Sequence, residues 1–275
     1  MNLRSHAIVA GMLLAWVSAA YGETPNRPLT VGIVPQQSPG ELARLWTPVL
    51  KHLEEHTGLT LQFETAKDVA TFDKRILAGE YDIVYSNPLV YALVLHPRLH
   101  YEAFAREKDR RLVGLLVVRK DSRYQTLADL AGADLAFPAE VAMAASVIPR
   151  AHLEKQGIAF TPHYVGSHDS VFLAVEKGIY AGGGGVTRTL EMLPAPVKDQ
   201  LRVLWTSTGY PPHPFAAHPR VPADIVRRLQ AALIAMDSEP AGQAILKPLA
   251  FTGFMSTRDA DYEVLRTLGY KLPGY

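Results

Sequence analysis

Segments typical of strands and of helices alternate along almost the whole chain, and this alternation restricts the fold more than any other feature. Residues 29–34 form a short apolar run typical of a buried strand, and apolar residues at 42–53 then recur at helical spacing. The same order returns at 59–78, 134–156 and 161–178. We therefore expect an α/β protein with mostly parallel sheets.

Two helix starts carry a capping box, in which a serine and an acid three residues later cap each other's backbone. The first consists of Ser38 and Glu41, with Pro39 at the first helical position, where proline is favoured. The second, Ser256 with Asp259, predicts a last helix. We expect only helices in the C-terminal part of the chain.

The first 22 residues have the features of a secretory signal peptide: one positive charge at Arg4, an apolar run at 7–20, and small residues at Ala20 and Gly22. The apolar run is shorter than the roughly 20 residues that span a bilayer, so a retained anchor is the weaker interpretation. Cleavage after Gly22 removes one of 28 basic residues and leaves 27 acidic ones, so the mature chain has no formal net charge. We expect an exported protein, periplasmic if the source is Gram-negative.

The composition excludes several classes of function. Without a basic stripe the chain lacks an electrostatic footprint for nucleic acid, and no later apolar run is long enough to cross a membrane. The absence of cysteine excludes disulfides, thiolate chemistry and a lipid-modified N-terminus. With 48% hydrophobic residues the chain can build two substantial cores, and we expect a monomer without a cofactor.

Residues 165–189 contain the most informative stretch. Ser167 is placed to cap a short helix, and His168 at the first helical position adds a side-chain donor to a helix N-terminus, which suits an anion. Four consecutive glycines follow, Gly184 among them, where the backbone must pass close to something. Arg188 comes next, and we expect it on the helix surface rather than at the anion. A capped surface helix with a flexible turn is the open alternative.

The strand predicted at 81–85 ends in Tyr85, Ser86 and Asn87, which a proline follows. In open α/β sheets ligands bind beyond the carboxyl ends of the strands, so these three residues are candidate ligand contacts. An ordinary strand-to-helix turn with an Asn-Pro breaker explains them equally well.

Five stretches together carry a resemblance to a known family. They are VVRKDSRYQTLADLAG (117–132), VGSHDSVFLAVEKG (165–178), GGGVTRTLE (183–191), LWTSTGYPPHPFAAHP (204–219) and GFMSTRDADYEVLR (253–266). In this order, and over essentially the whole mature chain, they resemble the phosphate/phosphite/phosphonate-binding family of periplasmic ABC-transporter substrate-binding proteins.

The resemblance implies a type II periplasmic-binding-protein fold, in which two lobes joined by two crossover segments close over a ligand. It places the crossovers near 111–115 and 205–208. Lobe one would then comprise 28–112 with 208–275, and lobe two 113–207.

The resemblance also implies roles for single residues. His168 would contact the oxyanion, and Tyr85 and Ser86 would contribute from the first lobe. A proline-rich loop containing Tyr210 and His213 would complete the site.

Two departures from the family pattern bear on the ligand. The family's Ser-Thr-Ser-Gly helix start, which holds phosphonate oxygens, is replaced at 142–145, with Ala142, Met143 and Ala144 in place of hydroxyl donors. Each lost donor to a charged oxygen costs roughly 1.5–3 kcal/mol. His213 stands where aminophosphonate binders carry an acid. We therefore expect a compact oxyanion, or an uncharged or singly charged ligand, to bind better than 2-aminoethylphosphonate. If His213 contacts the anion, affinity should rise as pH falls through its pKa, about 6.5 for a free histidine; a rigid surface turn is the open alternative for His213.

These features predict a non-catalytic solute-binding protein that delivers a small oxyanion to an ABC permease or a sensor histidine kinase. The alternative is a metal or metalloid-oxyanion binder that uses His168, His213, Tyr85 and Tyr210, although none of these four has H-x-x-x-H or cysteine spacing. An enzyme is not expected, because the Ser-His-Asp at 167–169 is contiguous and cannot form a catalytic triad within one helical turn.

Overall fold

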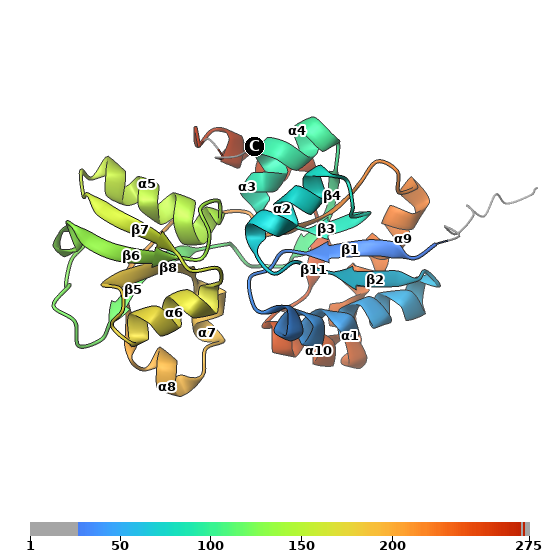
Figure 1. The fold of residues 1–275 in the computed structure, drawn as a ribbon. Helices are drawn as coiled ribbons and strands as arrows, with labels where there is room; N and C mark the ends of the chain where they lie inside the picture. The colour runs from blue at the N-terminus through green and yellow to red at the C-terminus, as the bar shows by residue number, and fades with distance from the viewer. Residues whose placement is uncertain (1–26, 271, 273–275) are drawn as a thin grey trace, which may run out of the picture.

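The computed structural model describes residues 27–270 and 272, which form two lobes, each built on its own β-sheet (Figure 1). The signal peptide expected at 1–22 lies outside the described residues. Within the described part, no helix is both long enough and apolar enough to span a membrane. The lobes stand side by side, and the chain passes between them twice (Figure 1).

The first sheet has six strands in the order β11-β4-β10-β3-β1-β2. β1 pairs in parallel with β2 and β3, whereas β10 lies between β3 and β4 and is antiparallel to both. The strands are β1 (Leu29–Ile33), β2 (Leu61–Glu64), β3 (Ile83–Tyr85), β4 (Glu102–Glu107), β10 (Pro214–Ala217) and β11 (Phe254–Ser256).

Helices cover both faces of the first sheet, with α1 and α10 on one side and α2 and α3 on the other (Figure 1). A π-helical turn, η1 (Tyr91–Leu95), joins α3 to α4 in one continuous helix. The helices of this lobe are α1 (Pro39–Thr57), α2 (Val69–Leu77), α3 (Pro88–Val90), α4 (His96–Leu99), α9 (Ala223–Ala235), α10 (Pro240–Leu246) and α11 (Glu263–Arg266).

The second sheet has five strands in the order β7-β6-β8-β5-β9, in which β6 is parallel to β7 and β8 and β5 is antiparallel to β8 and β9. Its strands are β5 (Gly114–Arg119), β6 (Ala133–Phe137), β7 (Phe160–Tyr164), β8 (Gly182–Val186) and β9 (Leu201–Thr206). Its helices are a π-helical turn η3 (Met143–Val147) that continues as α5 (Ile148–Lys155), then α6 (His168–Glu176), α7 (Thr187–Glu191) and α8 (Ala195–Lys198).

Both sheets are mixed, which corrects the expectation of mostly parallel sheets. β5 and β10 are the first strands after each crossover, and the crossovers lie at the carboxyl ends of the parallel strands. A strand that starts at that edge runs antiparallel to the parallel strands that end there, as β10 does beside β3 and β5 does beside β8. The sequence patterns also missed four strands. No element was predicted for β4 or β10, a close backbone approach with a flexible turn as the alternative was predicted for β8, and only helices were expected around β11.

The capping boxes are formed only in part. Ser38 Oγ accepts the backbone N–H of Glu41 at 3.4 Å, but the Glu41 carboxylate pairs with Arg44 instead of capping in return. The predicted pair of Ser256 and Asp259 is wrong, because Asp261 accepts the N–H of Arg258 at 3.2 Å and so starts the last helical segment two residues later.

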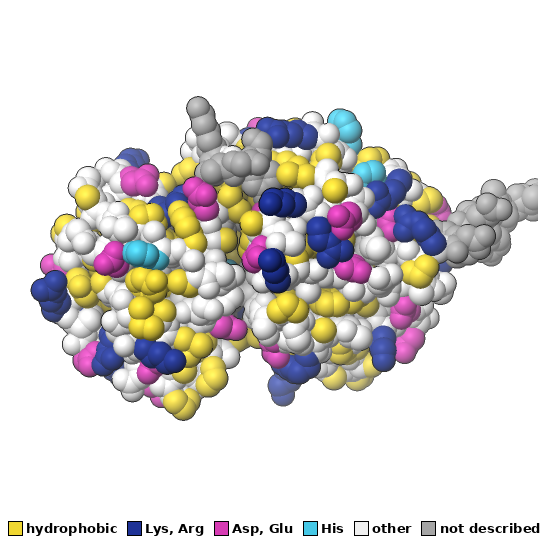
Figure 2. Space-filling view, in the orientation of Figure 1, with side chains coloured by type: hydrophobic (Ala, Val, Ile, Leu, Met, Phe, Trp, Pro, Cys, Tyr) yellow, Lys and Arg dark blue, Asp and Glu magenta, His cyan; other side chains and the backbone are white. Residues whose placement is uncertain are grey.

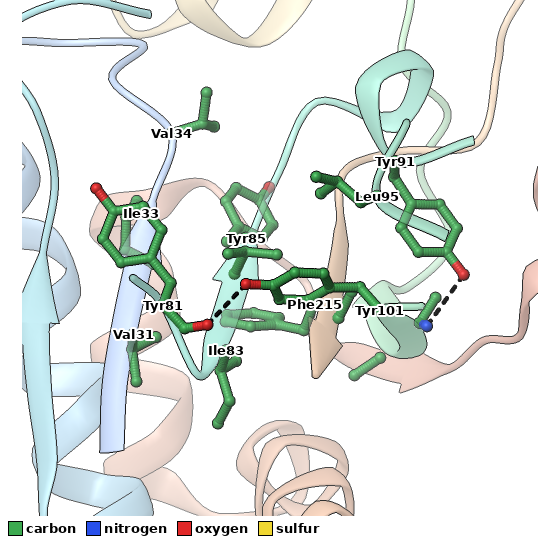
Figure 3. Close-up of a cluster of buried hydrophobic side chains, with 14 of the residues drawn as sticks. Val31, Ile33, Val34, Tyr81, Ile83, Tyr85, Tyr91, Leu95, Tyr101 and Phe215 are labelled. Carbon is green, nitrogen blue, oxygen red and sulfur yellow. Dashed lines mark hydrogen bonds between the residues drawn. The ribbon is translucent and has the colours of Figure 1, made fainter. Parts of the chain in front are cut away.

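Tyrosines and a phenylalanine fill the core of the first lobe around β3 and β10 (Figure 3). Tyr101 donates its hydroxyl to the carbonyl oxygen of Tyr81 at 2.7 Å, so its buried polar atom is satisfied. The rings of Tyr85 and Phe215 lie 5.1 Å apart across the two strands. This packing holds the strand ends next to His213, which immediately precedes β10.

The two connections between the lobes, from β4 to β5 and from β9 to β10, pair with each other. Leu112 and Tyr210 exchange backbone hydrogen bonds of 2.8 and 2.9 Å. Gly114 donates its N–H to Ser207 Oγ at 2.9 Å, and Ser207 returns a backbone bond of 2.8 Å to Gly114. The paired connections form one narrow strip between the sheets.

Candidate functional site

A small cavity of about 30 Å³ lies between the lobes, at the edge where strands of both sheets end. Figure 2 shows the two-lobed outline with its narrower waist. Apart from two histidines, no ionisable side chain is among the described residues that line this cavity. The lining residues are Val34, Pro35, Gln36, Val69, Asn87, Pro88, Leu112, Pro138, Ala142, Met143, Ala144, Ala145, His168, Val186 and His213.

Three helix N-termini meet at this cavity, one from the first lobe and two from the second. Asn87 precedes α3, Ala142 precedes η3, and His168 is the first residue of α6. The first N–H groups of a helix have no intrahelical acceptor, and the helix dipole makes the potential there positive. α3 begins with Pro88, which has no N–H, and its Leu89 N–H is bound by Asn87, so α3 contributes its dipole. The free N–H donors for an anion come from η3, which has no side-chain cap, and from the first residues of α6.

Asn87 lines the cavity, but its side chain already has partners. Its Oδ1 accepts the N–H of Leu89 at 2.9 Å, as a helix cap does. Its Nδ2 donates to the carbonyl oxygen of Val141 at 2.9 Å, which lies in the other lobe. Asn87 thus connects the lobes across the cavity, a role that the strand-end rule could not distinguish from ligand contact.

His168 presents a neutral imidazole to the cavity. It is 5% exposed, and burial lowers its pKa to about 4. The Thr189 hydroxyl donates to the carbonyl oxygen of Val186 at 3.0 Å and lies 3.3 Å from His168 Nδ1. With the Thr189 proton on the Val186 carbonyl oxygen, Nδ1–H of His168 is the donor in this pair and Nε2 is left as an acceptor. His168 can therefore accept a hydrogen bond from a ligand hydroxyl.

His213 is the second neutral imidazole. Its ring stacks on Tyr85 with 5.3 Å between centroids, and its Nε2 lies 3.3 Å from the amide nitrogen of Gln36, which donates to it. Burial, reinforced by the positive charge of Arg188, lowers the pKa of His213 to about 3. His213 thus stays neutral near pH 6.5, which corrects the expectation that its protonation raises affinity at that pH.

Glycines behind the site let the helix start at 142–145 approach the second sheet. A Cβ on Gly184 would lie 1.9 Å from the carbonyl oxygen of Ala145, and one on Gly114 would lie 2.0 Å from that of Ala144. The predicted close backbone approach at the glycine run is confirmed. Gly184, a candidate ligand contact, is approached by the helix start at 142–145. All four residues of that start line the cavity.

Five of the predicted residues do not line the cavity in this structure: Tyr85, Ser86, Ser167, Gly184 and Tyr210. Tyr85 lies behind it, against His213. Ser167 caps α6 by accepting the N–H of Ser170 at 3.1 Å. Tyr210 belongs to the paired connections between the lobes.

Gln36 lines the cavity and was missed. It follows the carboxyl end of β1, so the rule that selected residues 85–87 after β3 would have selected it too. No sequence pattern marked the apolar lining residues Leu112 and Val186, because they line the cavity only where the two lobes pack against each other.

Arg188 does not lie on the helix surface as expected. Its side chain is 19% exposed and forms an ion pair with Glu107 of the other lobe, while its guanidinium stands 4.4 Å from the ring centroid of Phe251. Burial raises the pKa of the Glu107 carboxyl, and the charge of Arg188 acts against that shift. A second ion pair between the lobes joins Arg110 to Glu191.

Comparison with known proteins agrees with this architecture. The chain is 23% identical over 224 residues to the phosphate-import protein PhnD of Mycolicibacterium smegmatis, over 74% of this chain and 70% of that protein. The structure is similar to a binding protein component of an ABC phosphonate transporter from Pseudomonas aeruginosa, with a TM-score of 0.80 and 20% identity over 88% of this chain and 86% of that one.

A second solved structure, PhnD1 from Prochlorococcus marinus in complex with methylphosphonate, has a TM-score of 0.79 and 17% identity over 88% of this chain and 96% of that one. At these identities the likeness establishes the fold, the two-lobed periplasmic-binding-protein fold that the resemblance implied. A family model for the periplasmic phosphonate substrate-binding protein of ABC transporters matches residues 31–262. The chain therefore belongs to the family of periplasmic phosphonate-binding proteins of ABC transporters, whose members bind substrates for transport.

Proposed function

We propose that this protein captures a compact, singly charged oxyanion that still carries a hydroxyl, such as monoanionic phosphate or a phosphonate, and delivers it to an ABC permease. One observation carries the proposal: three helix N-termini and the neutral acceptor of His168 converge on a cavity whose described lining has no charged side chain. The helix N–H groups would take the charged oxygens, and His168 Nε2 would take the hydroxyl.

The same lining argues against ligands with an ammonium group. No carboxylate is among the described residues that line the cavity itself, and Glu107 in the adjoining pocket is already paired with Arg188. A ligand amine would therefore be buried without a free counter-charge. Methyl and methylene groups of the ligand would instead face Met143, Ala144 and Ala145. The relative named for phosphate import and the solved relative that holds methylphosphonate support this ligand class.

Capture would proceed by closure of the two lobes, for which we propose the boundaries 28–112 with 208–275 and 113–207. The lobe-to-lobe bond from Asn87 to Val141 indicates that the structure is in a closed arrangement. Closure excludes water and so strengthens each hydrogen bond to the ligand. Small-angle scattering should therefore show a smaller radius of gyration with saturating ligand, and an unchanged profile would contradict closure.

The proposal includes a periplasmic location after signal-peptide removal and a monomeric receptor. A sensor histidine kinase is a second possible recipient, and a metalloid oxyanion such as arsenate or arsenite is the alternative ligand class. Titration calorimetry with phosphate, phosphite, methylphosphonate, 2-aminoethylphosphonate, sulfate, arsenate and arsenite decides among these ligands.

Sulfate is the informative member of that series, because it has no proton to give to His168 at neutral pH. We expect phosphate or methylphosphonate to bind and sulfate to bind at least about tenfold more weakly, since a buried acceptor then faces an anionic oxygen. Affinity for methylphosphonate should fall as pH rises through its last pKa, because the dianion has no hydroxyl left to donate to His168. Dianionic phosphate still carries one hydroxyl, so its affinity should depend less on pH. Equal binding of sulfate, or tightest binding of the aminophosphonate, would refute the assignment.

His168→Ala tests the contact itself. It should weaken phosphate binding about tenfold or more, the scale of one bond to a charged group. His163→Ala is the matched control, because His163 lies on edge strand β7, pairs with Asp134 and does not line the cavity. If His168→Ala binds phosphate as tightly as the wild type, His168 does not contact the ligand and its role is structural.

A further inference from the structure

Three side chains able to bind a metal ion gather on the first lobe, and none of them lines the cavity between the lobes. His52 and His56 lie one helical turn apart on α1, and Glu239 immediately precedes α10. One ligand atom from each lies within 4.8 Å of the others. Figure 1 shows α1 and α10 side by side at the lower edge of this lobe.

The His56 ring is held in the tautomer that a metal requires. Its Nδ1 lies 2.7 Å from the carbonyl oxygen of His52 and can only donate to it, so in the neutral ring Nε2 carries the lone pair. That Nε2 lies 3.2 Å from a carboxylate oxygen of Glu239. Two lone pairs at this distance repel unless a proton or a cation lies between them. In metal sites the histidine ring nitrogen that does not bind the metal usually donates its N–H to a carboxylate, a backbone carbonyl or water, and His56 makes such a bond to a backbone carbonyl.

His52 supplies the second and independent observation. Its side chain is 3% exposed, and its Nε2 has no hydrogen-bond partner within the described part of the chain. This atom lies 3.7 Å from the same carboxylate oxygen of Glu239. A buried polar atom without a partner is costly, so it needs an explanation. Burial, together with the nearby His56, lowers the pKa of His52 and so favours the neutral form that binds metals.

Glu239 is placed as a ligand rather than as a helix cap. It occupies the N-cap position of α10, yet its carboxylate makes no capping hydrogen bond and faces the two imidazoles. Pro240 follows at the first helical position and limits the freedom of the backbone there. The Glu239 side chain is 38% exposed, which leaves a way in for an ion and a water molecule.

We propose that His52, His56 and Glu239 bind a divalent transition-metal ion, with Zn²⁺ as the preferred ion and water as the fourth ligand. Two imidazoles and one carboxylate form a known zinc ligand set, with bonds of about 2.0–2.2 Å. Ligand atoms of such a tetrahedron lie about 3.3 Å apart. The 3.2 and 3.7 Å separations already approach that value. The ion would fasten the end of α1 to the start of α10.

The sequence contains this signal as H-x-x-x-H at His52 and His56, outside the cavity residues to which the metal hypothesis was confined. The carboxylate partner comes from Glu239, far along the chain, and only the packing of α10 against α1 brings it there. The proposed ion belongs to one lobe, so it is independent of the anion proposal.

Calorimetry of the full chain, purified without a polyhistidine tag and stripped with a chelator, tests the site with ZnCl₂. We expect one Zn²⁺ per chain, and a melting temperature about 5–10 °C higher at a Zn²⁺ concentration of about 100 times Kd. His56→Ala and Glu239→Gln should each weaken binding about 100-fold or more, since even supporting residues contribute 10–100-fold. Both residues are partly exposed, so these variants avoid the folding risk of changing buried His52.

His163→Ala is the matched control, because His163 pairs with a single carboxylate, Asp134, at 2.8 Å and should leave zinc binding unchanged. Substitution with Co²⁺ gives a second readout, an absorption spectrum typical of four-coordinate Co²⁺ that His56→Ala abolishes. Absence of Zn²⁺ binding at micromolar concentration would overturn the proposal. Wild-type affinity in both His56→Ala and Glu239→Gln would overturn it equally. Phosphate binding should be the same with and without Zn²⁺.

Discussion

Replacing Arg188 by methionine should lower the free energy of unfolding by about 3–5 kcal/mol, because it leaves the Glu107 carboxylate buried without its counter-charge. Glu107 is 1% exposed, and one of its oxygens already lacks a hydrogen-bond partner within the described residues. The cation–π contact of Arg188 with the ring of Phe251 contributes a further stabilisation of about 0.5–2 kcal/mol. The loss of stability in Arg188→Met should therefore exceed the loss from breaking an exposed ion pair, which costs about 0–1 kcal/mol.

The deficit should depend on pH in a defined direction. Burial raises the pKa of Glu107 in the folded protein, so the folded state keeps this proton to a higher pH than the unfolded chain does. Stability attributable to this group therefore falls as pH rises from the unfolded value, about 4.3, through the folded one. Without Arg188 the folded pKa rises further, so the Arg188→Met deficit should be larger near pH 8 than near pH 5.

Urea unfolding followed by tryptophan fluorescence measures this effect, because Trp46 packs 5.9 Å from Phe251, the ring under Arg188. The double variant Arg188→Met/Glu107→Gln should recover most of the loss, since it removes the buried charge together with its partner. The reasoning is refuted if Arg188→Met costs less than about 1 kcal/mol, the exposed-pair scale. Equal deficits at both pH values, or additive losses in the double variant, would contradict it as well.

Two further predictions concern the neighbourhood of the cavity. Gly184→Ala should destabilise the protein by about 1–3 kcal/mol, because the new Cβ would lie 1.9 Å from a carbonyl oxygen. Gly40→Ala in α1, with nothing within 4 Å, is the control in the same urea titration and should stabilise the protein by up to about 1 kcal/mol. Because burial lowers the pKa of His168 to about 4, the unfolded chain takes up this proton first as pH falls below about 6.5. Stability should therefore drop between about pH 6.5 and about pH 4, by about 3 kcal/mol for this residue. Thermal unfolding across that range checks it: His168→Gln should reduce the drop, and the remainder comes from His213, whose pKa is also lowered. A drop of unchanged size in His168→Gln would count against the assignment.

Local patterns in the sequence determined which segments form the framework. The apolar periodicity of 42–53 and the serine at position 38 define α1, because a helix needs only its own face and its own cap. An apolar run likewise predicted β1, and the strand predicted at 81–85 contains β3. His168 was selected from its position at a helix start and the residues at 142–145 from the family resemblance, and both line the cavity.

The tertiary structure alone decided what depends on two distant segments meeting. The four-glycine run forms β8 because it pairs with β5 and β6, and neighbours on both faces leave no space for a Cβ, Ala145 at Gly184 and Val171 at Gly183 among them. Arg188 moved from a predicted surface to the boundary between the lobes because Glu107, on another sheet, offers a buried charge. The neutral state of His168 and the meeting of Glu239 with the α1 histidines have the same origin. Burial and long-range pairing are set by how elements pack, and no local window of sequence contains that information.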